Sequence, residues 1–82
     1  MTQWVVYIIK CNDNSLYTGI TNDLSARLAS HESGTGAKYT RGRGPFRLVF
    51  QERAPNRSAA TRRENQIKAL GARAKWRLIG GL

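Results

Sequence analysis

Five side chains in this sequence could carry out proton transfer, phosphate binding or metal binding. Tyr7 and Tyr17 lie in apolar segments that favour strands, and Arg27 and the single histidine, His31, lie one helical turn apart. Glu64 falls on the apolar side of a second predicted helix. Phenols and imidazoles exchange protons, a guanidinium fork matches phosphate oxygens, and a carboxylate binds hard divalent cations.

Each of these residues also has a purely structural interpretation. Arg27 could extend along the sheet surface beside a hydrogen-bonded His31, and the two tyrosines could pack in the core with their hydroxyls outward. A carboxylate on an apolar face has to be paired, protonated or bound to a metal. For Glu64 the structural partners are Lys68, at i+4 on the same helix, and Arg27 across the fold.

The elements that must position these residues follow from hydrophobic periodicity and turn signals. Helix caps are expected at Thr21 or Asn22 and at Ser58, and Gly34 can end the first helix. The pattern predicts an α+β fold with a small three-stranded mixed or antiparallel sheet flanked by helices, in the order β-β-α-β-α-α. The predicted strands span 4–10, 16–20 and 46–52, and the helices span about 22–33, 58–70 and 72–79.

The hairpin formed by the first two strands decides whether the tyrosines share a face. If Asp13-Asn14 formed a two-residue turn, Tyr7 would lie opposite Ile20 and the tyrosines would take opposite faces. We predict instead a three-residue loop at 13–15, which puts Tyr7 opposite Thr21 and both phenols on one side. Gly19 has no side chain and would leave a concavity between Tyr7 and Tyr17, which gives it a structural role.

Length and composition limit the classes of protein. The 82 residues suffice for one domain, 1–82, and a single cysteine excludes an internal disulfide and a cysteine-based zinc site. No apolar run approaches the roughly 20 residues that cross a bilayer, so no membrane partner is expected. The amino-terminal residues lack a secretion signal, which predicts a cytoplasmic protein.

The net charge of +9 is concentrated in the second part of the chain. Residues 1–33 hold two basic and three acidic side chains, whereas residues 34–82 hold 12 basic and two acidic ones. Such asymmetry favours a nucleic-acid partner, although a solvated surface is the structural alternative. The candidate contacts are Lys38, Tyr39, Arg41 and Arg43 in the glycine-rich segment 34–45, expected to be a mobile loop, and Arg62 and Arg63 beside Glu64.

Taken together, these residues resemble a known family, the GIY-YIG nuclease superfamily. The resemblance covers residues 4 to about 70 and rests on Val5-Val6-Tyr7, Tyr17-Thr18-Gly19, Arg27, His31 and Glu64. The run Ala37-Lys38-Tyr39-Thr40-Arg41-Gly42 further resembles the small stand-alone bacterial branch, in which the domain is the entire protein.

Four positions depart from the family pattern. Val5-Val6 stands where the family name has Gly-Ile, and Thr18 replaces the Ile of the second triplet, both mild changes. Ile20 occupies a position where some members carry lysine, and no Asn follows Asn65. His31 is the candidate to replace the missing lysine.

The resemblance implies a phosphodiesterase site that uses one divalent ion. Tyr7 would be the general base on water, assisted by Tyr17 or His31, and Arg27 would hold the scissile phosphate. Arg27 and the bound ion would favour the Tyr7 phenolate. Glu64 would bind one Mg²⁺ or Mn²⁺.

The expected function is therefore a metal-dependent DNA endonuclease with little sequence specificity. Single-stranded or structured DNA, branched or flapped, is the expected substrate, in repair, recombination or DNA processing. RNA is the alternative substrate, and no obligate protein partner is evident. Two other functions stay open, namely a catalytically inactive nucleic-acid-binding module of the same fold and a small basic RNA- or ribosome-associated protein.

Overall fold

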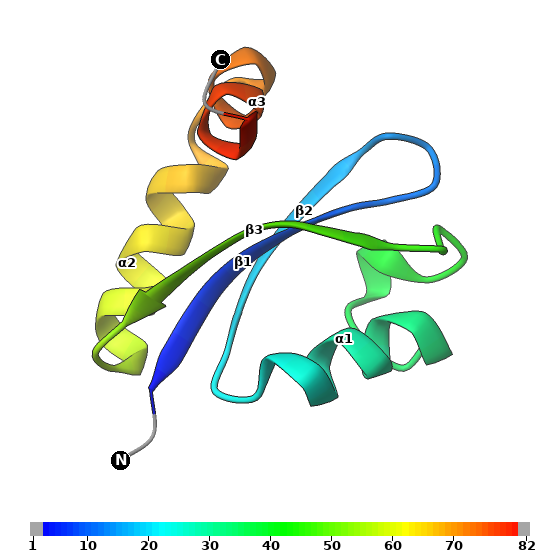
Figure 1. Ribbon diagram of the computed structural model, residues 1–82, viewed down its shortest axis with the longest axis horizontal. Coiled ribbons are helices and arrows are strands. Elements are labelled where there is room, and N and C mark those ends of the chain that lie inside the picture. Colours follow the sequence, from blue (N-terminus) through cyan, green and yellow to red (C-terminus); the bar gives the residue numbers. More distant parts are fainter. Residues whose placement is uncertain (1–2, 81–82) are drawn as a thin grey trace.

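The computed structural model describes residues 3–80, apart from the side chain of Tyr39, and shows one antiparallel sheet with three α-helices. The chain order is β-β-α-β-α-α, as predicted, and the strand order in the sheet is β2-β1-β3 (Figure 1). The elements are β1 (Trp4–Lys10), β2 (Leu16–Thr21), α1 (Leu24–Ser33), the 3-10 turn η1 (Lys38–Thr40), β3 (Arg47–Ala54), α2 (Arg57–Lys68) and α3 (Ala72–Gly80).

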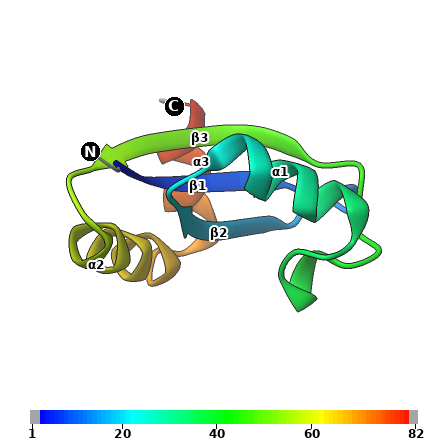
Figure 2. The same ribbon diagram turned by 90° about the horizontal axis from the view of Figure 1, so that it is seen from below.

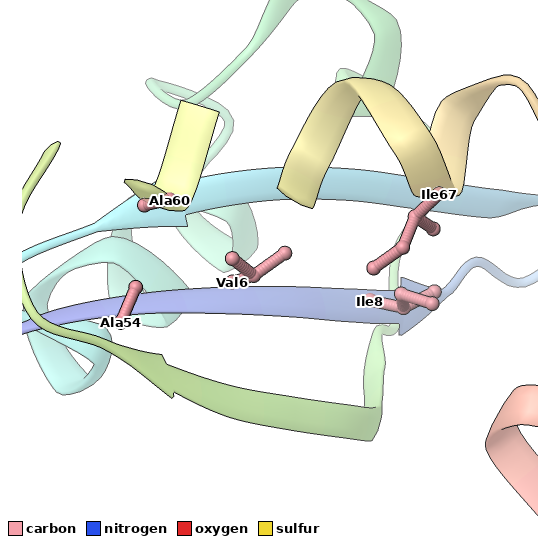
Figure 3. Close-up of a cluster of buried hydrophobic side chains, with 5 residues drawn as sticks. All are labelled: Val6, Ile8, Ala54, Ala60 and Ile67. Atoms are coloured by element: carbon pink, nitrogen blue, oxygen red, sulfur yellow. The ribbon is translucent and has the colours of Figure 1, made fainter. Parts of the chain in front are cut away.

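The central strand β1 is buried on both faces, as its unbroken apolar sequence predicts. Val6 and Ile8 point to one face and form the core cluster with Ala54, Ala60 and Ile67 (Figure 3). The odd-numbered side chains of β1 point to the opposite face. Alternation along one strand therefore separates the apolar core from a second, more polar layer.

The helices lie on both sides of the sheet. Figure 2 shows α1 on one face of the sheet and α3 on the other. Helix α2 packs against β2 and β1 through the face that carries Val6 and Ile8. The odd-numbered side chains of β1 therefore face α1, and this layer between sheet and helix holds most of the polar residues singled out above.

The hairpin register differs from the prediction by two residues. Tyr7 pairs with Gly19, and Tyr17 pairs with Ile9. The predicted three-residue loop was wrong because the connection comprises residues 11–15, closed by a hydrogen bond of 2.8 Å from the Cys11 N–H to the Ser15 carbonyl. A shift of two preserves side-chain parity, so both tyrosines still point to one face.

Two predicted helix caps were wrong by one or two residues. Asp23, rather than residue 21 or 22, caps α1, and Asn56, rather than Ser58, caps α2. In each case the side-chain oxygen accepts a hydrogen bond from the N–H three residues on, which satisfies a donor at the helix start. Gly34 ends α1 with φ 81°, as predicted.

The predicted inner face of α2 is right for Ala60 and Ile67 but wrong for Leu70. Helix α2 ends at Lys68, so Leu70 lies beyond its last turn and is 36% exposed. Within residues 3–80, no helix is both long and apolar enough to cross a bilayer.

Candidate active site

The layer between the sheet and α1 is organised around a hydrogen bond between Tyr7 and His31. The Tyr7 hydroxyl oxygen lies 2.8 Å from His31 Nε2, and both side chains are almost completely buried. Arg27 lies one turn before His31 on α1 and points its Nε at the Tyr7 hydroxyl, at 3.4 Å. The structure thus brings Tyr7 of β1 together with two residues of α1, which the sequence placed on a separate element.

Aromatic rings enclose this group. The ring centroid of Tyr17 lies 6.4 Å from that of Tyr7 and 5.3 Å from that of His31, and Phe46 lies 6.0 Å from His31. Gly19 is needed beneath Tyr7, because a Cβ there would lie only 2.6 Å from the Tyr7 hydroxyl oxygen. The concavity expected at Gly19 is therefore occupied by the Tyr7 phenol.

The loop 34–45 is attached to the site through Thr40. His31 Nδ1 lies 2.9 Å from Thr40 Oγ1, and the Thr40 hydroxyl donates to the Ala37 carbonyl at 2.8 Å. Thr40 is 1% exposed. Loop 34–45, expected to be mobile, thus contains η1 and is anchored on α1. The sequence does not mark Thr40 as a candidate, because its side chain carries neither charge nor ring and only its burial distinguishes it from the surrounding polar residues.

Burial raises the pKa of Tyr7 above its ordinary value, despite the opposing hydrogen bond from Arg27. The hydrogen bond and charge of Arg27 do favour the phenolate, as expected, but loss of hydration outweighs them in the net shift of the Tyr7 pKa. The charge of Glu64 also raises the pKa of Tyr7. Tyr7 is a neutral phenol at neutral pH and needs an acceptor for its proton.

His31 is suited to be that acceptor. Burial, and then the positive charge of Arg27, lower the pKa of the imidazole, so His31 is neutral near pH 7. The hydrogen bond to Tyr7 raises the pKa of Arg27, which keeps the guanidinium charged. The site therefore combines a neutral phenol, a neutral imidazole and a fixed positive charge.

The lowered pKa of His31 predicts that acid destabilises the fold. Above pH 6.5 the imidazole is neutral in the folded and the unfolded chain. Below it the unfolded chain takes up a proton that the folded chain resists, so the free energy of unfolding should fall. Thermal melting from pH 7.5 to 5 measures this fall, and His31→Gln should flatten the profile. Tyr7 and Arg27 face the imidazole, and because the pKa of each is raised they keep their charge states over this range. An equally steep profile in His31→Gln would contradict the assignment.

Glu64 lies on α2 and pairs with Lys68, with 3.1 Å between Oε2 and Nζ. Of the two structural partners considered for Glu64, Lys68 and Arg27, the structure shows Lys68, at i+4. The Glu64 side chain is 16% exposed and that of Lys68 is 51% exposed, so the pair lies at the surface. Residues 3–80 contain no cluster of three or more His, Cys, Asp or Glu side chains that could enclose a metal. A cation bound here would take one carboxylate and complete its shell with water or substrate oxygens, which suits Mg²⁺.

The basic residues of loop 34–45 differ in their surroundings. Lys38 and Arg41 are exposed at the two ends of η1. Arg43 instead binds the Asp13 carboxylate in the hairpin turn, where hydrogen bonds from Ser15, and then Arg43, lower the pKa of Asp13. Lys38 and Arg41 are therefore better placed than Arg43 to meet a phosphate chain, whereas the Tyr39 side chain lies outside the described part of the molecule.

The two arginines that precede Glu64 take different directions. Arg63 forms an ion pair of 2.9 Å with Glu52 on β3, so it fastens α2 to the sheet. Arg62 is exposed and donates to Ser58 one turn back on α2. The structure does not bring Arg63 to the Tyr7–His31 group, and Arg62 remains a surface candidate for nucleic-acid contact.

Comparison with known proteins agrees with this arrangement. The family model for the GIY-YIG catalytic domain matches residues 3–77. UPF0213 protein SH2523 from Staphylococcus haemolyticus is 49% identical over 79 residues, which cover 96% of each chain. The solution NMR structure of UPF0213 protein BH0048 from Bacillus halodurans is similar at a TM-score of 0.62 and 49% identity, covering 94% of this chain and 82% of that one. A second NMR structure, of EF2693 from E. faecalis, has a TM-score of 0.64 and 36% identity over 95% of this chain and 84% of that one. With this match along almost its whole length, the chain belongs to the GIY-YIG family, among its UPF0213 members.

Proposed function

We propose that this protein is a metal-dependent endonuclease that hydrolyses phosphodiester bonds in single-stranded or structured DNA with little sequence specificity. Membership of the GIY-YIG family implies a nuclease-type activity. The observation that carries the proposal is the 2.8 Å hydrogen bond between Tyr7 and neutral His31, with Arg27 beside it. A role in DNA repair, recombination or processing follows from such a substrate.

The three side chains suggest how water is activated. A water molecule at the Tyr7 hydroxyl gives a proton to the phenol oxygen while the phenol gives its own to His31 Nε2. The Tyr7–His31 distance is already short enough for that transfer. A free phenolate is then never required, which matters because the pKa of Tyr7 is raised. His31, rather than Tyr17, is the assisting group in this mechanism.

Arg27 and Glu64 supply the electrostatic part of the mechanism. The Arg27 guanidinium stabilises negative charge as it develops on the phenol oxygen and on the phosphate. Glu64 would hold one Mg²⁺ or Mn²⁺, which would stabilise charge on the phosphate oxygens. In the protein without metal, the Lys68 ammonium group lies against this carboxylate and balances its charge.

The test is cleavage by the purified chain with Mg²⁺ or Mn²⁺. Matched oligonucleotides are presented as single strands, duplexes, flaps, branched junctions and RNA. The proposal expects metal-dependent cuts in DNA, faster in the single strands, flaps and junctions than in the duplex, at positions with little sequence preference. Binding without cleavage under every metal condition would contradict the proposal and favour the inactive binding module. Cleavage or tight binding confined to RNA would contradict the DNA assignment.

The exposed charges of η1 predict how the salt concentration affects binding. Neutralising Lys38 and Arg41 together to Gln should weaken DNA binding and flatten the slope of log K against log salt. The expected change is about 0.7–0.9 for each phosphate that the variant no longer neutralises. Arg43→Gln should change the slope less, because Arg43 is already paired with Asp13. Fluorescence anisotropy between about 50 and 200 mM salt measures these slopes.

The control for this series is the double variant Arg73→Gln with Arg77→Gln. It removes the same charge from α3, which lies on the face of the sheet opposite α1 (Figure 2). This control should lower affinity only through net charge. If the control flattens the slope as much as the Lys38 and Arg41 double variant does, loop 34–45 does not contact the phosphate chain.

A further inference from the structure

The hydrogen bonds around His31 share one donor-to-acceptor direction, from Tyr7 on the sheet toward loop 34–45. The Thr40 hydroxyl has a single proton and donates it to the Ala37 carbonyl at 2.8 Å. Its oxygen is therefore an acceptor toward His31 Nδ1, 2.9 Å away. This places the imidazole proton on Nδ1 and leaves Nε2 with a free electron pair facing the Tyr7 hydroxyl.

The opposite tautomer fits the same contacts poorly. With the proton on Nε2, the imidazole would donate to the Tyr7 oxygen, which already faces the Arg27 N–H. Nδ1 would then need the Thr40 proton that is directed at Ala37. Because His31 and Thr40 are almost fully buried, water cannot easily supply the donor that Nδ1 would then lack.

The position of the loop on the imidazole also depends on Gly36. A Cβ at Gly36 would lie 2.6 Å from His31 Nδ1, so only glycine lets the backbone pass beside the ring. The Gly36 N–H bonds the Ser30 carbonyl at 3.0 Å, which fixes the loop to α1. The turn from Gly36 to Thr40 is therefore built around the edge of the ring that carries Nδ1.

We propose that Thr40 is a positioning residue that holds His31 in its Nδ1–H tautomer, so that Nε2 is ready to receive the Tyr7 proton. The catalytic part of this inference rests on the proposed function, whereas the tautomer itself does not. Thr40 lies between the exposed charges Lys38 and Arg41, so the segment predicted to contact the phosphate chain also orients the base. Nucleic-acid binding and proton transfer thus share one short turn.

The tautomer can be observed directly by NMR, because His31 is the single histidine of the chain. Long-range ¹H–¹⁵N correlation distinguishes a proton-bearing nitrogen from an unprotonated one. The wild-type protein at pH 7.5 should show the proton on Nδ1. A proton on Nε2 would overturn the proposal, whether or not the protein cleaves DNA.

Two substitutions test whether Thr40 is the cause. Thr40→Val keeps the shape and removes the hydroxyl, so the Nε2–H form should become measurable. Thr40→Ser keeps the hydroxyl and should retain the wild-type tautomer. Thr35→Val is the matched control, because Thr35 lies in the same loop but bonds Ser30 and Ser33 instead of His31. A Thr40→Val protein that keeps its fold and its pure Nδ1–H signal would overturn the assignment to Thr40.

Cleavage supplies the second measurement. Thr40→Val should slow the single-turnover rate by about tenfold, the effect of removing one hydrogen bond, while DNA affinity stays within about twofold of the wild type. Thr40→Ser should restore the rate. An unchanged rate in Thr40→Val with an altered tautomer would overturn the catalytic part of the proposal. Absence of cleavage in the wild type would contradict the proposed function and leave the tautomer measurement to decide the role of Thr40.

Discussion

Replacing Tyr7 with Phe should lower the rate of DNA cleavage by about 10²–10⁴-fold, the range that general acid–base catalysis contributes. The substitution keeps the ring and removes the oxygen that contacts His31 and Arg27. DNA affinity should remain close to that of the wild type, because the phenol is buried and uncharged. Single-turnover rates at saturating protein, with anisotropy for binding, separate the two effects.

A loss of stability is expected as well and has to be separated from the loss of chemistry. Removing the hydroxyl leaves His31 Nε2 buried without that partner, which costs about 1–3 kcal/mol. Ile9→Val is the matched control, since Ile9 is the next residue on the same face of β1, is fully buried and loses a methylene at about 0.5–1.5 kcal/mol. Ile9→Val should melt earlier and cleave normally when folded. Wild-type cleavage by folded Tyr7→Phe would place the base elsewhere.

Replacing Glu64 with Gln should lower cleavage by at least about 10²-fold, because the amide keeps the shape but loses the charge that attracts a divalent cation. Metal-free DNA binding should persist or tighten slightly, since a negative charge leaves a site that receives phosphate. The stability cost should be about 1 kcal/mol, because Lys68, the partner at i+4, is half exposed, although Glu64 itself is only 16% exposed. Nicking rates against Mn²⁺ concentration, binding isotherms and melts on one preparation measure all three effects.

The control for Glu64 is the other carboxylate of the basic half of the chain. Glu52→Gln breaks the ion pair with Arg63, a similar surface contact between α2 and the sheet. It should change stability by a comparable amount and leave the metal dependence of cleavage unaltered. A Glu64→Gln protein that melts early but cleaves normally when folded would refute the metal assignment.

The general arrangement of the fold could be predicted because it depends on local periodicity. The apolar run of β1 predicts a central strand, and the four-residue spacing of Arg27 and His31 predicts neighbours on one helix. The shared face of the two tyrosines was also predictable, because parity survives a register shift of two. The register itself was not, because the five-residue turn is closed by backbone hydrogen bonds that turn composition does not specify.

The grouping of Tyr7, Arg27 and His31 was predictable, whereas the energetics of the candidate site were not. Residue types suggested that Arg27 would favour a Tyr7 phenolate, whereas the sign of the pKa shift depends on how much hydration burial removes. Thr40 was not predictable, because its importance comes from one long-range contact across loop 34–45. The partner of Arg63 on β3 depends in the same way on how α2 is docked.

The strand order β2-β1-β3 has a consequence for biosynthesis. The first strand to leave the ribosome is the central one, and its register with β3 joins Trp4 to Ala54. Until residue 54 has emerged, one edge of the most apolar segment of the chain has no strand to pair with, although the hairpin with β2 can already form. Such long-range pairing slows folding and exposes the nascent chain to aggregation.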